Sequence, residues 1–397
     1  MTSSYTFDGE CTNILDKDIK ALFAKHLNEE CLYIDGPLAG SYGDKYIVTL
    51  KNTNEYFLTV ALPGSPPCKI ENEAACLLWL RQNTTIPVPA MAFCNFDDDV
   101  ELGRHYFVTQ RVPGDELASC WEDLSATVKR DIVMQLVDYV SQLREHQSHQ
   151  IAGFAFDKGS RCGRQDAIAQ GPVFDPDYFL IKRALLVEKS CVKSKCDRQI
   201  FSNNGPFKTL ASYYASRLRM YTHLFETCPT VQCLHDLLGT LKTLIQEDLE
   251  GISWDQRPCF LTHRDLWPGN VLVHDGKIAA IVDWELAGYF PPDFELKHFR
   301  IDGIVSHRGL EVLRRECKLW NDLFEYELES RGGYTEKSKR LQVDDRTAGH
   351  WRRLESIRFC LATLFSDLYD HREIETDNME CCINQFRKLF GQLILDE

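Results

Sequence analysis

The stretch that decides the fold lies in the second half of the chain, where residues 261–273 read LTHRDLWPGNVLV and residues 281–285 read IVDWE. Asp265 supplies a carboxylate, Asn270 supplies an amide five residues later, and Asp283 supplies a second carboxylate after an apolar run. The Pro-Gly pair inside the first stretch lets the chain turn, so that Asp265 and Asn270 can face one cavity. An Asp-Gly turn after the next strand predicts a hairpin that returns Asp283 to the same place.

These side chain types form a set that suits phosphoryl transfer. One carboxylate must accept or orient the proton of the acceptor hydroxyl. A second carboxylate and an amide oxygen must hold Mg²⁺ against the phosphates, because the protein contributes mainly positioning and charge neutralisation. The pattern therefore favours a phosphate-handling site.

Outward from this stretch, the sequence predicts an α+β fold. The first hundred residues contain short β-rich runs, at 31–34, 46–50, 56–62, 91–96 and 105–111. Residues 69–82 repeat aliphatic side chains at helical spacing, which predicts an amphipathic helix between two of these runs.

Beyond residue 113 the pattern becomes mostly helical. Helical spacing is found at 128–143, 209–225, 234–249 and over much of 309–395, and short β-like runs lie at 260–262, 271–274 and 278–282. We therefore expect a small strand-rich N-terminal lobe over residues 1–108, a hinge at 109–112, and a larger helical C-terminal lobe over 113–397.

The composite motif has a family resemblance. His-Arg-Asp with Asn five residues after the Asp, then Asp-Trp-Glu where protein kinases carry Asp-Phe-Gly, resembles the aminoglycoside phosphotransferase and choline kinase-like branch of the protein-kinase-like fold. The likeness extends to IPVP at 86–89, YFVTQRVPG at 106–114 and AGYFPP at 287–292.

The resemblance implies a two-lobed, kinase-like fold with ATP and Mg²⁺ bound between the lobes. It implies Asp265 as the catalytic base and Asn270 and Asp283 as magnesium ligands. His263, in the same motif, is a second catalytic candidate, although a packed loop anchor is the simpler interpretation of a histidine there. In the segment that joins the lobes, Gln110 and Val112 are expected to border the nucleotide.

The sequence also predicts a phosphate-binding loop in the small lobe. Residues 36–43 read GPLAGSYG between two strand signals. Gly40, Ser41 and Gly43 can bring free backbone N–H groups close to phosphate oxygens.

The small lobe departs from the family pattern in its phosphate cation. In the family, a strand Lys or Arg pairs with a helix glutamate; Glu73 fits the glutamate, but Thr59 stands at the position of the cation. A misplaced alignment is one explanation, although neither Lys51 nor Lys69 lies inside the strand. A second is that Lys45, on the preceding strand, points to the cleft and supplies the charge. A third is that the site has lost ordinary kinase chemistry.

Composition narrows the class of partner. The chain has 59 acidic and 45 basic residues and a net charge of −14, which disfavours nucleic acid and suits a neutral or cationic small molecule. Apolar runs are far shorter than the roughly 18 residues that cross a membrane. The first residues lack the basic and apolar regions of a secretory signal, so a cytoplasmic protein is expected.

We therefore expect an ATP- and Mg²⁺-dependent phosphotransferase that acts on a hydroxyl of a small metabolite. Two alternatives stay open because of Thr59. One is a catalytically inactive binding module, and the other is a kinase-fold enzyme that uses Asp265 and His263 for acid–base chemistry without phosphoryl transfer. Glu285 could be a buried acid beside the metal or a solvated side chain.

Overall fold

The computed structural model describes the chain in segments, which are residues 14–38, 43–62, 68–96, 101–157, 168–175, 177, 194–253, 257–291, 294, 310–332, 345–369 and 376–395. The chain divides into two compact units. The first unit comprises Met1–Ser148, Ala152–Phe174 and Cys259–Glu336, and the second comprises His149–Ile151, Asp175–Pro258 and Lys337–Glu397. The hinge expected at residues 109–112 lies inside the first unit and stays a prediction.

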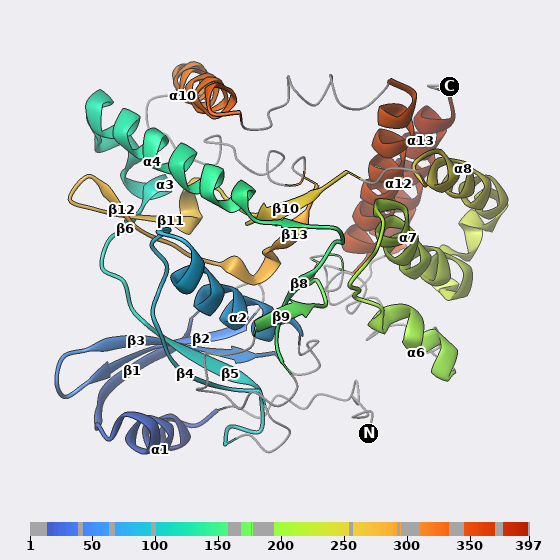
Figure 1. Cartoon of the computed structure of the whole chain (residues 1–397). Coiled ribbons are helices and arrows are strands. Elements are labelled where there is room, and N and C mark those ends of the chain that lie inside the picture. Colours follow the sequence, from blue (N-terminus) through green and yellow to red (C-terminus); the bar gives the residue numbers. More distant parts are fainter. Residues whose placement is uncertain are drawn as a thin grey trace. The chain divides into compact units, whose positions relative to one another are not determined.

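The first unit begins with a helix and an antiparallel sheet (Figure 1). Its first elements are α1 (Asp16–Leu27), β1 (Cys31–Leu38), β2 (Gly43–Leu50), β3 (Glu55–Ala61), α2 (Cys68–Asn83), β4 (Met91–Asn95) and β5 (Tyr106–Gln110). In the described residues the strands form a five-stranded sheet in the order β1-β2-β3-β5-β4. All four neighbouring pairs are antiparallel.

The two faces of this sheet have different neighbours. Side chains at alternate positions of β2, β3 and β5 join those of α1 in one apolar cluster, which includes Phe23, Val48, Leu58 and Val108. Helix α2 contacts β3, β4 and β5, and Figure 1 shows α1 and α2 on opposite sides of the sheet. Residues out of phase with the α1 cluster therefore face the α2 side.

Helix α2 differs from the expected amphipathic helix. Besides its aliphatic side chains, the helix buries Lys69, Asn72 and Glu73. A buried polar group is costly unless it is paired, so this second face must meet polar partners. Sequence periodicity detected only the aliphatic face.

The remainder of the first unit combines short strands with helices. It contains β6 (Asp115–Glu116), α3 (Leu117–Cys120), η1 (Trp121–Asp123), α4 (Ala126–Glu145), β7 (Gln147–Ser148), β8 (Gly153–Phe156), β9 (Ile168–Gly171), β10 (Cys259–Thr262), η4 (Pro268–Asn270), β11 (Val271–His274), β12 (Lys277–Ile281), η5 (Trp284–Leu286), β13 (Gly288–Phe290) and α10 (Leu310–Ser330). Ser125 caps α4 by accepting a hydrogen bond from the Val128 N–H. Strands β11 and β12 form the hairpin expected from the Asp-Gly turn.

The second unit is helical in its described residues. Its elements are α6 (Lys195–Ser202), α7 (Leu210–Thr227), η3 (Pro229–Leu237), α8 (Leu238–Gly251), α12 (Asp345–Tyr369) and α13 (Thr376–Leu395). Thr209 and Ser212 form a reciprocal capping box that starts α7. Helix α12 packs against α7, α8 and α13, with Tyr221 stacked on Phe365.

The fold class predicted from the sequence is confirmed: an antiparallel strand-rich N-terminal sheet is followed by a largely helical remainder. Among the described residues, no helix combines the length and the apolar character needed to cross a membrane.

Candidate functional site

Asp265 and Asn270 lie on the turn that joins β10 to β11. The Asn270 side-chain N–H₂ donates to the backbone oxygen of Asp265 at 2.8 Å and to its Oδ2 at 3.0 Å. The backbone N–H of Trp267 also donates to the backbone oxygen of Asp265, which tightens the turn. Because the amide nitrogen of Asn270 is committed to Asp265, the amide oxygen is the end left to bind a cation.

The environment of Asp265 raises the proton affinity of its carboxylate. Burial, followed by repulsion from Asp283, raises the pKa of Asp265 to about 6, although the hydrogen bond from Asn270 opposes this shift. A carboxylate with a raised pKa is a better proton acceptor than an exposed one, which suits a general base.

His263 is fully buried behind this turn. Its Nε2 lies 3.0 Å from the backbone oxygen of Val282, and its Nδ1 accepts a hydrogen bond from the Asp265 N–H at 3.2 Å. The imidazole ring also lies 4.3 Å from the ring of Trp284. Both ring nitrogens are therefore engaged with the backbone, so this geometry favours an anchor that holds the Asp265 turn against the Asp283 segment.

Asp283 sits on a strained turn between β12 and η5. Its φ and ψ are 65° and 54°, in the left-handed region, which costs a residue other than glycine about 1–2 kcal/mol. The preceding residue, Val282, donates its backbone N–H to the backbone oxygen of Asn270 at 2.9 Å. This bond joins the Asp283 segment to the turn that carries Asn270 and Asp265.

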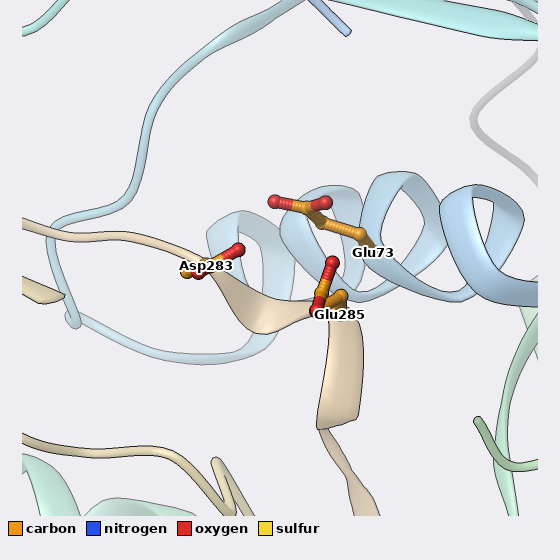
Figure 2. Close-up of side chains that lie close together, drawn as sticks. All are labelled: Glu73, Asp283 and Glu285. Atoms are coloured by element: carbon orange, nitrogen blue, oxygen red, sulfur yellow. The ribbon is translucent and has the colours of Figure 1, made fainter. Parts of the chain in front are cut away.

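The carboxylates of Glu73, Asp283 and Glu285 lie close together. Glu73 from α2 approaches Asp283 and Glu285, and one oxygen from each lies within 4.8 Å of the others (Figure 2). Burial, followed by repulsion from Asp283, raises the pKa of Glu73 to about 8, while Lys45 opposes the shift. Glu285 is 5% exposed, so the solvated alternative for this residue is wrong.

Lys45 extends toward these carboxylates from β2. Its cross-strand partner on β3 is Thr59, so the two side chains lie on the same face of the sheet. The Lys45 Nζ is 3.6 Å from the Asp283 Oδ1, and the two side chains are 37% and 29% exposed. Burial disfavours the ammonium charge, but attraction from Asp283 and Glu73 outweighs it and raises the pKa of Lys45.

The sequence did not identify two polar residues of α2, Lys69 and Asn72, as part of the site. Lys69 forms a buried ion pair with Glu285, with 2.9 Å between Nζ and Oε2. Asn72 donates from its amide nitrogen to the backbone oxygens of Glu285 and Ala287, both at 2.9 Å. The helical spacing of Lys69, Asn72 and Glu73 was a usable signal, because such residues share one helix face.

The oxygen donors around Asp283 fit Mg²⁺. Carboxylate and amide oxygens are the hard ligands that this ion prefers, and Asn270 and Asp283 can supply them together. The Asp283 Oδ1 is buried and accepts no hydrogen bond within the described part of the chain, and the Lys45 ammonium lies 3.6 Å from it. A carboxylate oxygen without a short hydrogen bond can still accept a bound cation.

The other expected nucleotide contacts are dispersed. Gly40 and Ser41 lie outside the described residues, and Gly43 is the first residue of β2. Gln110 and Val112 line a cavity of about 560 Å³, together with the β2–β3 turn. None of the carboxylates or lysines described above lines this cavity.

The chain is similar to known proteins in both sequence and fold. Residues 36–322, more than half of the chain, match the sequence profile described as the phosphotransferase enzyme family. Clavilactone A biosynthesis cluster protein Y of Ampulloclitocybe clavipes is 25% identical over 237 residues, which is 56% of this chain and 50% of that protein. A subtelomeric hrmA-associated cluster protein of Aspergillus fumigatus is 26% identical over 101 residues, which is 25% of this chain and 20% of that protein.

This chain therefore spans half or less of these two curated relatives. Among solved structures, ADP-bound aminoglycoside phosphotransferase APH(2'')-Ib matches with a TM-score of 0.50 and 11% identity, over 94% of this chain and 98% of that one. At this identity the likeness establishes the fold.

Proposed function

We propose that this chain, which belongs to the phosphotransferase enzyme family, transfers the γ-phosphoryl group of ATP to a hydroxyl of a small molecule. Its acidic balance, a net charge of −14, favours a neutral or cationic acceptor. The single observation that carries the proposal is the convergence of Asp265, Asn270 and Asp283 through the bonds between their turns, with the Lys45 ammonium at the Asp283 carboxylate.

In the proposed reaction, Asp265 accepts the proton of the acceptor hydroxyl as its oxygen bonds to the γ-phosphorus. The bond between the γ-phosphorus and the bridging oxygen breaks, and ADP leaves with that electron pair. Asn270 and Asp283 would hold Mg²⁺, which, when bound, neutralises charge on the phosphate oxygens. Lys45 would provide the positive charge for which the family uses a strand Lys or Arg.

Thr59 favours a second candidate. This residue is 5% exposed in the middle of β3 and carries no charge. The alternative to a phosphotransferase is therefore a binding module that holds nucleotide without transferring phosphate. The acid–base alternative loses support, because both ring nitrogens of His263 are engaged with the backbone.

Two substitutions separate the proposed roles. Asp283→Ala should abolish Mg²⁺-dependent ATP binding in calorimetry, because the variant removes a metal ligand. Asp265→Asn should reduce kcat by about 10²–10⁴-fold with little change in ATP affinity, because a base acts on the acceptor alone. Full Mg²⁺-dependent affinity in Asp283→Ala would refute the metal assignment. Equal losses of rate and affinity in Asp265→Asn would refute the base assignment.

A further inference from the structure

Lys69 is a charged residue in a nearly dry position beside the proposed phosphate site. Its side chain is 2% exposed, and that of its partner Glu285 is 6% exposed. The Lys69 ammonium also lies 5.9 Å from the centre of the Phe174 ring. A buried ion pair loses much of its hydration, so its stability gain alone is a weak explanation for its presence.

The ion pair of Lys69 and Glu285 also affects the charges around Asp283. Three carboxylates, those of Glu73, Asp283 and Glu285, lie together (Figure 2), and two lysines reach them. Lys69 is bonded to Glu285 at 2.9 Å, whereas Lys45 is 3.6 Å from Asp283. The ion pair with Lys69 offsets the negative charge of Glu285, so Asp283 and Glu73 are the carboxylates that attract the Lys45 ammonium most strongly.

We infer that Lys69 is a positioning residue, which acts through Glu285 to keep the Lys45 ammonium available to the phosphates of the nucleotide. This inference rests on the proposed function. Without Lys69, the buried Glu285 carboxylate would lack its counter-charge, and the nearby ammonium of Lys45 would be drawn to it. Phosphate binding would then compete with an internal ion pair.

A separate set of bonds holds the backbone of η5. Asn72 donates to the Glu285 and Ala287 oxygens, and its own Oδ1 accepts a hydrogen bond from the Phe154 N–H at 2.6 Å. Gly153 permits this approach, because a Cβ there would lie 2.5 Å from the Asn72 Oδ1. The segment therefore stays attached to α2 when the charges of Lys69 and Glu285 are both removed.

This arrangement makes a double-mutant test decisive. The variants are Lys69→Met, Glu285→Gln and the double variant, and the readout is the affinity for a non-hydrolysable ATP analogue with Mg²⁺ in calorimetry. Lys69→Met should weaken binding about ten- to a hundredfold, because a charge-assisted phosphate contact is impaired. The double variant should bind within about threefold of the wild type, since no uncompensated carboxylate remains.

Lys129→Met is the matched control. Lys129 is also nearly buried, at 6% exposure, and pairs with Glu316 on α10 at 2.7 Å. It contacts none of the three carboxylates in the described structure, so its replacement should lower the melting temperature without changing nucleotide affinity.

Each other outcome overturns a specific statement. Unchanged affinity in Lys69→Met contradicts the inference, and a double variant as weak as Lys69→Met would show that Lys69 does not act through Glu285. If Lys69→Met fails to fold, the double variant still tests the inference. A folded double variant whose nucleotide affinity is tenfold or more below that of the wild type would contradict the inference. Failure of the wild type to bind nucleotide would instead refute the proposed function.

Discussion

Replacement of Lys45 by methionine tests whether a lysine on β2 supplies the phosphate cation that β3 lacks. Lys45→Met keeps most of the aliphatic stem and removes the ammonium, whose nitrogen lies 3.6 Å from the Asp283 Oδ1. At that distance two unit charges attract by about 4–5 kcal/mol at an effective dielectric constant of about 20. Because both side chains are about a third exposed, solvent screening reduces the net value of this pair to about 1 kcal/mol.

The expected effect on stability is therefore small, and the expected effect on nucleotide binding is larger. A charge-assisted contact with phosphate is worth about 1.5–3 kcal/mol, which corresponds to about one to two decades in dissociation constant. Calorimetric titration with a non-hydrolysable ATP analogue and Mg²⁺ measures this loss directly. Adding Thr59→Lys to Lys45→Met should restore part of the affinity, because the new charge lies across from position 45 on the same sheet face.

Lys51→Met provides the control for this experiment. Lys51 follows β2, is 58% exposed and pairs with Glu30, so its loss should leave nucleotide affinity unchanged. The reasoning is refuted if Lys45→Met retains both the nucleotide affinity and the turnover of the wild type. Lys45 would then be a surface lysine and not the phosphate cation of the small lobe.

Two further predictions concern stability. Burial raises the pKa of Glu101, but hydrogen bonds from three side chains outweigh this effect and hold the pKa below its usual range. The donors are Lys25, Asn95 and Tyr106. Its stabilising effect is complete above the unfolded pKa of about 4.3 and is lost as the pH falls through the lower folded value. The difference in melting temperature between the wild type and Glu101→Gln should therefore become smaller at acid pH. A difference that does not change with pH would contradict this prediction. Glu55→Gln, which removes the acidic partner of an exposed ion pair, is the control. In the second unit, Asp248→Asn should lower the unfolding free energy by about 3 kcal/mol in urea titration, because Arg353 loses its fully buried partner; an effect no larger than that of Asp236→Asn, at an exposed pair, would refute it.

The fold and the central turns were predictable because their signals are local. Asp265 and Asn270 are five residues apart on one turn, and the Asp-Gly hairpin returns Asp283 to them. Strand alternation also suggested that Lys45 points to the cleft, and in the structure Lys45 lies across from Thr59 with its ammonium 3.6 Å from the Asp283 Oδ1. Local spacing and strand periodicity suffice for such placements.

Helical spacing indicates that Lys69, Asn72 and Glu73 share one face of α2, but it does not identify the partners of that face, because they are distant along the chain. Lys69 pairs with Glu285, and Asn72 donates to the backbone oxygens of Glu285 and Ala287. These partners lie more than two hundred residues later in the chain. A buried lysine is also an exception to the rule that charged side chains stay solvated unless they are paired, so sequence pattern alone does not indicate it. His263 illustrates the reverse case, because its motif suggests catalysis while its contacts are those of an anchor.

The most direct test of the central claim is a calorimetric titration of the wild-type chain with ATP, in the presence and in the absence of Mg²⁺. A phosphotransferase that uses Asn270 and Asp283 as metal ligands and Lys45 as its small-lobe cation should bind ATP tightly only when Mg²⁺ is present. Absence of ATP binding under both conditions would contradict the account.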